Sequence, residues 1–552
     1  MKRHITVTFV DGKSCQYESG VNLLQISKDV QHLYATPIVA ANINNEIKDL
    51  QFCVTFDCTV TFFDLYTETG IKVYQRSLTF VMIAAAHELF PNGKVTVEHS
   101  LSKGLYCELH IGEKITKDHL EALEKHMRVI VDENRPITMK SLPIAKAIEL
   151  FKTAGQAEKL KHIQQLKRER VRIYYCGESY GYFYGTMTPN TGDLKVFEIK
   201  QHASGFILRF PHKENPNQLP VFTNQCKLSE IFLEAERWGE ILQCGYVATL
   251  NEYVQNDKIH DITRVAEALH EKKIAQIADF VSEHKEVRVI LVAGPSSSGK
   301  TTFAQRLTIQ LKVNGLRPVA LSLDDYFIDR ARTPRDEKGD YDFEAIEAID
   351  LELFNEHLIR IMNGEAVEVP TYNFLIGQRE YCGHVIQIDK NQPLIIEGIH
   401  GLNERLTAAV PREHKIKIYI SALTQLSIDN HNRIPTTDTR LIRRIVRDSQ
   451  FRSHDALKTL KMWPSVRRGE EKNIFPFQED ADIMFNSALL YELGVLKKYA
   501  EPLLEKITPE WPEYSEAKRL LKFLSYFASI EDNEIPFNSI LREFIGSSCF
   551  AK

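Results

Sequence analysis

The chain has neither long hydrophobic runs nor paired cysteines. None of its uninterrupted apolar stretches approaches the ~18 residues that a transmembrane helix needs, so we expect no membrane-spanning helix and no membrane partner. Its nine cysteines are scattered and form no CxxC pair, which argues against a zinc site of the usual spacing and against a disulfide framework. Reduced thiols are the simpler interpretation, and we therefore expect a cytoplasmic protein.

A large excess of one charge is also absent. The sequence holds 69 Lys and Arg residues against 74 Asp and Glu residues, a formal net charge of -5. This balance argues against a chain built wholly to coat nucleic acid. With 43% hydrophobic residues and a mean hydropathy of -0.27, the composition is that of an ordinary globular protein. A length of 552 residues is too great for a single core and predicts about three or four domains.

What the sequence does contain is a glycine-rich stretch between a predicted strand and a predicted helix. Residues 294–301 read Gly-Pro-Ser-Ser-Ser-Gly-Lys-Thr, after an apolar run at 287–293. Two glycines let the backbone wrap around phosphate oxygens, while Lys300 supplies positive charge and Thr301 a metal-binding hydroxyl. The stretch predicts a phosphate-binding P-loop. The residues predicted to contact the nucleotide are Gly294, Ser297, Ser298, Gly299, Lys300, Thr301 and Thr302.

Apolar runs alternate with helical patterns from residue 287 onward. The runs lie at 287–293, 318–323, 393–396, 416–420 and 482–485. This alternation is typical of an α/β domain with a buried parallel sheet. Ligands of such sheets bind beyond the carboxyl ends of the strands, where Gly294, Asp324 and Glu397 are expected to emerge. The acidic side chains would therefore converge on the phosphates.

Three segments together resemble the signatures of the uridine kinase and phosphoribulokinase family. They are the P-loop at 294–301, Leu-Ser-Leu-Asp-Asp-Tyr-Phe at 321–327 and Leu-Ile-Ile-Glu-Gly-Ile-His at 394–400. The resemblance implies ATP and Mg²⁺ as cofactors, with Asp324 as the catalytic base and Lys300 as a second catalytic group. It implies Thr301, Glu397 and Asp324 as metal ligands. The alternatives left open are a helix cap or Asx turn for Asp324 and a structural ion pair for Glu397.

Two further segments resemble the acceptor site of the same family. Residues 340–344 and 348–350 are similar to the segment in which an Asp hydrogen-bonds ribose hydroxyls, a role that falls on Asp342. Residues 368–374 are similar to the Pro-x-Tyr-x-Phe element, in which Tyr372 and Phe374 would flank the nucleoside base. Uridine and cytidine kinases place a base-reading His where this chain has Gly377. A larger pocket is therefore predicted, suited to a purine nucleoside, another sugar alcohol or looser specificity.

A basic helix at residues 436–448 resembles the Asp-x-x-Arg lid of these kinases. Its arginines occur at i, i+3, i+4 and i+7 and so share one helical face. The resemblance implies a lid that closes over ATP, with Arg443 catalytic, Arg444 and Arg447 on the nucleotide, and Arg440 on the substrate. The alternative is a solvated charged helix.

The N-terminal half resembles part of a different enzyme. A predicted hairpin at 5–18, a helix at 22–30 and short strands at 38–50 are similar to the β-grasp TGS domain of threonyl-tRNA synthetases. Segments between 76 and 132 resemble the editing domain of that enzyme, but its HxxxH positions fall on Arg76 and Phe80. Neither residue can serve as a neutral imidazole base, so we expect no editing chemistry.

Two features of the N-terminal half invite functional interpretations. Cys176 and His202 could suggest a metal site, but without partner ligands at suitable spacing a buried structural Cys and a hydrogen-bonded His are expected. The segment 158–172 carries six Lys and Arg residues. It leaves a nucleic-acid partner open, although a solvated helix face is the favoured interpretation.

These observations predict five parts and one leading function. The parts are a TGS-like β-grasp domain (1–63), an α+β synthetase-like region with a degenerate editing site (64–260), a connecting helix (261–285), an α/β P-loop kinase domain (286–490) and a helical extension (491–552). We expect ATP-dependent phosphorylation of a nucleoside 5′-hydroxyl. The alternatives are another small hydroxylated acceptor, such as a pentose phosphate, or an RNA-associated ATP-dependent regulator. The extension is expected to brace the kinase domain or to form a homo-oligomer interface, without chemistry of its own.

Overall fold

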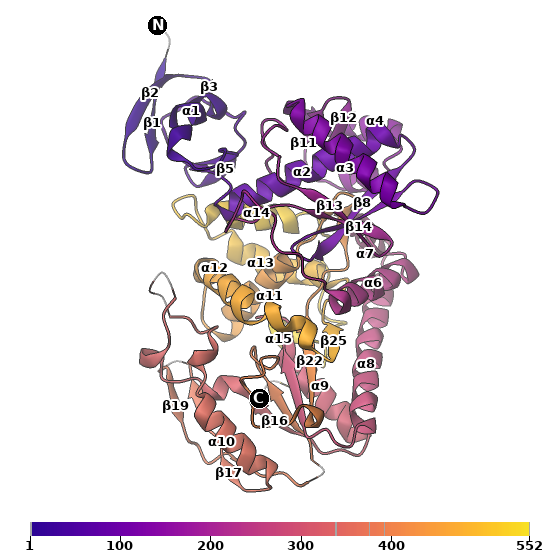
Figure 1. Ribbon diagram of the computed structural model, residues 1–552, viewed down its shortest axis with the longest axis vertical. Helices are drawn as coiled ribbons and strands as arrows, with labels where there is room; N and C mark the ends of the chain where they lie inside the picture. Colours follow the sequence, from indigo (N-terminus) through magenta and orange to yellow (C-terminus); the bar gives the residue numbers. More distant parts are fainter. Residues whose placement is uncertain (1–2, 337–338, 340, 375, 391, 551–552) are drawn as a thin grey trace.

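A computed structural model gives the arrangement of the chain (Figure 1) and describes residues 3–336, 339, 341–374, 376–390 and 392–550. Asp340, in the first predicted acceptor segment, and Leu375, directly after the second, lie outside the described residues. The β-grasp and synthetase-like regions occupy one end of the elongated molecule and the kinase sheet the other, while helix α8 (Ile259–Glu283) runs along one side between them. Among the residues described, no helix combines the length and apolar character needed to cross a bilayer.

The first region is a five-stranded sheet packed against one helix. Its order is β2-β1-β7-β4-β5, with a parallel pair at the centre between β1 and β7. The predicted helix is confirmed as α1 (Leu23–Val30), and it begins where the side chain of Asn22 accepts a hydrogen bond from the backbone N–H of Gln25 at 2.8 Å. The strands are β1 (His4–Phe9), β2 (Ser14–Glu18), β4 (Ala40–Ile43), β5 (Glu46–Lys48) and β7 (Cys58–Phe63), with a short pair β3 (Val21–Asn22) and β6 (Cys53–Val54).

The second region holds two antiparallel sheets around a long buried helix. Helix α2 (Glu68–Leu89) buries a continuous apolar set that includes Phe80. One sheet has the order β13-β14-β9-β8 and the other β10-β11-β12. Their strands are β8 (Lys94–Leu101), β9 (Gly104–His110), β10 (Ile137–Pro143), β11 (Arg170–Cys176), β12 (Ser179–Tyr182), β13 (Glu198–His202) and β14 (Gly205–Arg209). The helices are α3 (Lys117–Asp132), α4 (Ile144–Thr153), α5 (Ala157–Gln164), α6 (Cys226–Ile241) and α7 (Val247–Gln255).

The kinase region is a three-layer α/β unit whose five predicted strands are all confirmed. The sheet order is β16-β21-β15-β22-β25, and every neighbouring pair is parallel. Ile290 and Val292 of β15 pack in the same core as α8 and α9, whereas Val289 and Leu291 pack with α10 on the other face. The elements are β15 (Val289–Ala293), α9 (Lys300–Val313), β16 (Val319–Ser322), α10 (Leu351–Met362), β21 (Leu394–Glu397), β22 (Lys415–Ser421) and β25 (Ile483–Asn486).

Short hairpins and the last helices complete the kinase half. The small strands are β17 (Val367–Glu368), β18 (Thr371–Asn373), β19 (Gln378–Glu380), β20 (Val385–Ile386), β23 (Ser427–Asp429) and β24 (Asn432–Arg433). The helices are α11 (Thr436–Phe451), α12 (Ala456–Asn473), α13 (Glu492–Leu504), α14 (Tyr514–Leu524) and α15 (Arg542–Ile545). In Figure 1 the helices α13 and α14 lie between the kinase sheet and the N-terminal regions.

The C-terminal extension links the two ends of the molecule. The hydroxyl of Ser515 accepts from the backbone N–H of Ile47 at 2.9 Å, and the side chain of Asn45 donates to the carbonyl of Pro509 at 2.9 Å. Farther along, Leu541 and Phe544 are fully buried in the core that contains β15 and α9. The extension therefore braces the kinase region, as expected, and also contacts the β-grasp domain.

Candidate active site

The P-loop connects β15 to α9 at the carboxyl edge of the sheet. A Cβ atom at Gly294 would lie 2.1 Å from the carbonyl oxygen of Ile420, so this position admits only glycine. Gly299 has φ +88 and precedes α9, which begins at Lys300. Left-handed backbone at this point turns the chain into the helix with its N–H groups facing outward. The predicted strand, loop and helix are thus confirmed in sequence order.

Thr301 and Glu397 meet at this edge. The Thr301 hydroxyl donates to the two carboxylate oxygens of Glu397 at 3.1 and 3.2 Å. Glu397 ends β21 and lies level with Val292 of β15 and Ser322 of β16, which places it in the middle of the sheet edge. A hydroxyl and a carboxylate held together in this way fit the oxygen ligands that Mg²⁺ prefers, so these two residues would hold the ion.

Burial controls the charge of this carboxyl. Burial raises the pKa of Glu397 to about 7, the Lys300 ammonium acts in the opposite direction, and Asp324 and Glu543 raise the pKa further. Lys300 itself donates to the carbonyl oxygen of Pro295 at 3.3 Å. Near neutral pH the Glu397 carboxyl is therefore poised between its protonated and charged forms, and a bound cation would favour the charged one.

Asp324 and Asp325 have different surroundings. Both lie in a short 3-10 turn, η2 (Leu323–Tyr326), where the Ser322 hydroxyl accepts from the Asp324 backbone N–H at 3.3 Å. The Asp325 carboxylate accepts from the backbone N–H of Tyr372 at 3.2 Å and so holds the hairpin β18–β19. The Asp324 charge instead raises the pKa of Glu397 and that of Glu344. Of the two carboxylates, Asp324 is the one positioned among the groups of the site.

Glu344 is a site residue that the sequence reasoning did not single out. Burial raises its pKa to about 7, with Glu470 and Asp324 acting in the same direction and Arg444 and Lys300 against it. One of its carboxyl oxygens is buried and has no hydrogen-bond partner. The predicted residue Asp342 uses its carboxylate to accept from the Glu344 backbone N–H at 3.1 Å. The sequence shows two acids two positions apart, and no local pattern in it distinguishes which one faces Lys300.

An aromatic wall adjoins these carboxyl groups. The ring of Phe327 lies 5.6 Å from that of Tyr372 and 6.3 Å from that of Phe374, centroid to centroid. Tyr372 is buried and its hydroxyl has no hydrogen-bond partner, whereas Phe374 is 56% exposed. The two predicted acceptor aromatics are therefore adjacent, with Phe374 the one available to stack on a ligand.

The space beside Gly377 is not the empty pocket that the sequence predicted. Gly377 has φ +72, and a Cβ there would lie 2.8 Å from the Cβ of Arg330. The Arg330 backbone N–H donates to the Gly377 carbonyl at 2.8 Å, and its guanidinium donates to the carbonyl of Phe374 at 2.5 Å. The expectation of an enlarged pocket is wrong because Arg330 fills the volume that a side chain at 377 would need.

The predicted arginine lid is a buried helix. Arg440 is 1% and Arg443 0% exposed, and α11 packs against α12, α13 and α15. Arg443 donates to the Glu492 carboxylate at 2.9 Å through Nε and to the Ser487 carbonyl at 2.8 Å through Nη2. Arg443 as a catalytic group stays a prediction, and its guanidinium here binds Glu492, Ser487 and the carbonyl of the P-loop residue Ser297. Helix α11 packs against three other helices here, and its role as a mobile lid stays a prediction.

The other three arginines of α11 have partners on the loop or on the helix itself. Arg440 donates to the Ser296 carbonyl at 3.0 Å and forms an ion pair with Glu470, and its contact with substrate stays a prediction. Arg444 donates to the Ser296 hydroxyl at 2.8 Å, and Arg447 pairs with Asp448. Buried carboxylates thus compensate the four like charges on one helical face. Arg444 is the member that lies within electrostatic range of Glu344.

The region that resembles an editing domain has a filled interior where catalytic groups would be needed. Phe80 is 0% exposed, and its ring lies 5.1 Å from that of Phe183. The Arg76 guanidinium donates to the Thr186 carbonyl at 2.5 Å. The absence of editing chemistry stays a prediction, and the structure adds Phe183, which the sequence did not indicate, as the packing partner of Phe80.

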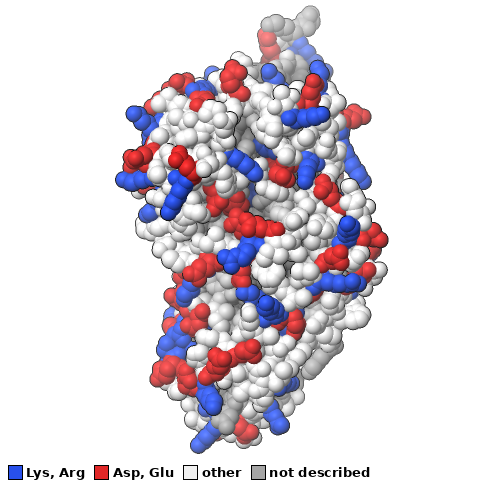
Figure 2. Space-filling model, turned by 90° about the vertical axis from the view of Figure 1, so that its right-hand side faces the viewer, with Lys and Arg blue, Asp and Glu red and all other residues white. Residues whose placement is uncertain are grey.

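The residues of the N-terminal half that invited functional interpretations have the following places in the structure. Cys176 and His202 belong to different sheets, and the described residues contain no group of three His, Cys, Asp or Glu side chains that could hold a metal ion. Within the basic segment 158–172, Lys159 is 1% exposed and contacts His431. On the face shown in Figure 2, basic and acidic side chains are interspersed along the molecule. A continuous basic stripe is not seen there.

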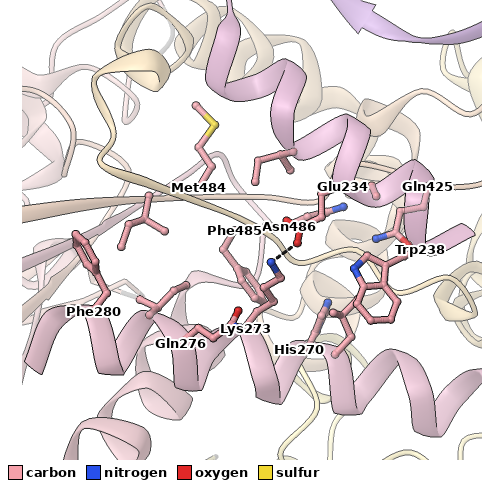
Figure 3. Close-up of a pocket in the computed structure, with 15 residues that line it drawn as sticks. Glu234, Trp238, His270, Lys273, Gln276, Phe280, Gln425, Met484, Phe485 and Asn486 are labelled. Atoms are coloured by element: carbon pink, nitrogen blue, oxygen red, sulfur yellow. Dashed lines mark ion pairs between the residues drawn. The ribbon is translucent and has the colours of Figure 1, made fainter. Parts of the chain in front are cut away.

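Two cavities lie away from the P-loop. One, of about 250 Å³, is lined by α6, α8 and β25, and in Figure 3 the Lys273 and Glu234 side chains point toward each other across it as an ion pair. The other, of about 790 Å³, is lined by β8, β9, α6 and α7 and contains several glutamates, among them Glu98, Glu108 and Glu236. No residue of the P-loop lines either cavity, so the candidate active site rests on the groups at the sheet edge.

The parallel sheet, the P-loop and the groups gathered beyond it define a P-loop kinase domain. The model of the Phosphoribulokinase / Uridine kinase family matches residues 289–490, and this segment is a domain of that family. Solved structures that resemble the chain include a possible uridine kinase from Bacillus stearothermophilus, with 18% identity, a TM-score of 0.26 and coverage of 38% of this chain and 97% of that one. D-glycerate 3-kinase from Cryptococcus neoformans is another, with 16% identity, a TM-score of 0.20 and coverage of 46% and 87%.

The N-terminal part resembles threonyl-tRNA ligase in its TGS and editing regions. The threonine–tRNA ligase of Francisella tularensis subsp. novicida (strain U112) is 28% identical to this chain over 202 residues, which are 37% of this chain and 32% of the ligase. The ligases of subsp. tularensis (strain SCHU S4) and subsp. holarctica (strain LVS) match with the same identity and coverage. The chain thus spans about a third of the length of the curated relatives that it matches.

Proposed function

We propose that this protein is an ATP- and Mg²⁺-dependent kinase that phosphorylates the 5′-hydroxyl of a nucleoside. The observation that carries the proposal is the meeting of Thr301 with Glu397 at the P-loop, beside Lys300 and Asp324. Phosphoryl transfer needs these parts: a cation site, a positive charge at the loop and a carboxylate to accept the proton of the attacking hydroxyl. A magnesium ion held by Thr301 and Glu397 would offset the charge of the triphosphate.

Each side chain of the site has a separate role in the proposed reaction. Asp324 accepts the proton of the acceptor hydroxyl, because it is the carboxylate not committed to holding the acceptor hairpin. The Lys300 ammonium lies near enough to lower the pKa of both Glu397 and Glu344, so its charge reaches the same centre. Phe374, with an exposed ring beside buried Tyr372 and Phe327, offers a stacking surface for the acceptor.

Glu344 and Asp342 supply the hydrogen-bond acceptors for a sugar. A carboxylate can accept from two adjacent hydroxyls, and the unpartnered buried oxygen of Glu344 is available for such a contact. Asp342 keeps its predicted role as a second ribose contact. The variants Glu344→Gln and Asp342→Asn separate the two roles. Substitution of the residue that binds the sugar will raise the KM for the acceptor and leave the KM for ATP unchanged.

A charged acceptor such as a pentose phosphate is the second candidate. The observation that favours it is the Arg330 guanidinium beside Gly377 and Phe374, since arginine is well suited to bind phosphate. Arg330→Lys keeps the charge but loses the planar fork, so it would weaken a phosphate contact and leave an uncharged nucleoside unaffected.

Release of ADP from ATP tests the proposal. Purified full-length protein, ATP and Mg²⁺ are combined with single nucleosides or single sugar phosphates, and turnover above the acceptor-free rate is measured. We expect at least one nucleoside to raise turnover. Stimulation by sugar phosphates alone would replace the leading acceptor with the second one, and no stimulation by any compound would remove the assignment as a small-molecule kinase.

A further inference from the structure

The end of the chain reaches the P-loop. The Glu543 carboxylate of α15 accepts from the backbone N–H of Thr302, in the first turn of α9, at 3.0 Å. Ile540 packs on the loop, since a Cβ at Gly299 would lie 2.5 Å from its Cγ2. The ring of Phe544 lies 4.9 Å from the Arg443 guanidinium carbon. Ile540, Glu543 and Phe544 thus cover one side of the predicted nucleotide site.

This segment is anchored and is not a loose tail. The Ser539 hydroxyl donates to Glu267 of α8 at 2.5 Å, and Glu267 also accepts from the Tyr491 hydroxyl at 2.7 Å. The Arg542 guanidinium donates to the carbonyls of Asp532 and Ile535 at 2.7 and 2.9 Å. Because the neighbouring side chains are fixed in the core, Glu543 is held at the loop by the fold.

The position of Glu543 is one that a phosphate would use. In a P-loop the backbone N–H groups of the loop and of the first helical turn bind the α- and β-phosphates of the donor. The Thr302 N–H already holds a carboxylate, and the Ser296 N–H donates to the Glu470 carboxylate at 3.1 Å. Two N–H groups of the anion site are therefore occupied by acids of the same chain. Glu543 is near enough to the metal pair for its charge to act on Glu397.

We propose that Glu543 is an intramolecular competitor of the phosphoryl donor, and that the C-terminal segment thereby sets the affinity of the P-loop for a nucleoside triphosphate. A triphosphate can use the Thr302 N–H only after the carboxylate leaves it, and a carboxylate that stays nearby repels the phosphates. Glu543 is thus a donor-affinity residue, in contrast to the purely bracing role that the sequence predicted for residues 491–552. The inference rests on the proposed function only in taking the P-loop as the donor site.

The dissociation constant of ATP with Mg²⁺ tests this proposal. Isothermal titration of the full-length protein compares the wild type with Glu543→Gln, Glu543→Ala and Glu534→Gln. Glu534 is an exposed acid in the same segment, so its exchange removes one charge without touching the loop. We expect Glu543→Ala to bind about tenfold more tightly, which corresponds to about 1.4 kcal/mol. The ATP affinity of Glu543→Gln will lie between those of the wild type and Glu543→Ala, since its amide oxygen can still accept from Thr302 but carries no charge.

The outcomes separate the proposal from its alternatives. If both Glu543 variants bind ATP with the wild-type affinity or more weakly, Glu543 does not compete with the donor. Glu543→Gln is close in shape to the wild type and keeps the test valid if the Ala variant unfolds. The titration contains no acceptor, so it is independent of the acceptor panel: nucleoside-stimulated turnover with an unchanged dissociation constant would overturn only this inference. Tighter binding with no stimulated turnover would overturn only the proposed reaction.

Discussion

The region that resembles an editing domain and the kinase domain differ in the kind of side chain that they bury. In the first, Phe80 and Phe183 fill the interior and Arg76 is bound to a backbone carbonyl. In the second, Glu397 and Glu344 stay half-buried with pKa values raised to about 7, next to Lys300. An apolar interior is stable without a ligand, whereas buried carboxyl groups near a cation site destabilise the empty fold.

This difference indicates in which part of the chain catalytic groups are to be expected. Unfavourable electrostatics kept in a core indicate function, because packing alone would replace them with apolar side chains. By this criterion, the charged groups at the P-loop mark the region in which a reaction is expected, and the packed rings of Phe80 and Phe183 contribute to stability. Four predictions test the comparison, from the largest expected effect to the smallest.

Loss of the base gives the largest effect. Asp324→Asn will lower kcat roughly 10²- to 10⁴-fold, since the amide cannot accept the proton of the acceptor hydroxyl. The ATP dissociation constant should stay within about threefold of the wild-type value, because the P-loop contacts remain. The rate of ADP release and an ATP titration measure the two quantities.

Asp325→Asn is the matched control for this exchange. Asp325 accepts a single backbone hydrogen bond from Tyr372, and an Asn side chain can still accept it. We expect this variant to keep kcat within a few fold of the wild type. Equal losses in the two variants would show that Asp324 has no special part in proton transfer.

Alanine substitutions of two phenylalanines compare the editing-like core with the acceptor site of the kinase domain. Phe80→Ala will lower the free energy of unfolding by about 3–5 kcal/mol, because Phe80 is 0% exposed in the editing-like core, and kcat of the folded fraction will not change. Phe374→Ala will leave stability nearly unchanged, as its ring is 56% exposed, but will raise the KM for the acceptor. Chemical denaturation and steady-state kinetics read the two effects. A fall in kcat for folded Phe80→Ala would break the comparison by coupling the two regions.

The third prediction concerns the pH dependence of Mg²⁺ binding at the kinase site. The pKa of Glu397 in the folded protein is about 7, above its ordinary value, so the protonated form stabilises the empty fold at low pH and this contribution is lost as pH rises through about 7. Mg²⁺ binds the charged form. Its apparent affinity should therefore be roughly tenfold lower at pH 6 than above pH 8.

Thermal unfolding with increasing Mg²⁺ at pH 6 and pH 8 checks this. The rise in Tm should require roughly tenfold more Mg²⁺ at the lower pH, and Glu397→Gln should abolish the difference. The same rise at both pH values would mean that the Glu397 carboxyl does not take part in Mg²⁺ binding.

Local pattern was sufficient to predict the main parts of the kinase fold. The apolar runs identified all five strands, and the loop sequence identified the turn into α9. The rule that parallel strands end at one edge placed Glu397 near the P-loop, and the family resemblance implied Thr301 as its partner on the metal. These features depend on residues within one strand, one turn or one sheet edge.

Contacts between distant segments could not be predicted. Glu543 meets Thr302 across 241 positions, and no periodicity in either segment records that contact. The arginine spacing in α11 predicted a shared face but not its partners Glu470 and Glu492, which belong to other helices. The same is true at Gly377, where a missing side chain suggested open space and the conformation of Arg330, 47 positions earlier, filled it.

Two glycines with the same backbone sharpen that last point and give the smallest expected effect. Gly377 and Gly383 have φ +72 and +78, but a Cβ at Gly383 meets nothing within 4 Å, whereas one at Gly377 would meet Arg330 at 2.8 Å. Alanine at either position costs roughly 1–2 kcal/mol for left-handed backbone. Gly377→Ala must also displace Arg330, so the acceptor KM should rise about threefold above that of Gly383→Ala. Equal KM values in the two variants would show that Arg330 does not shape the acceptor site, because backbone strain is common to both and only the contact with Arg330 differs.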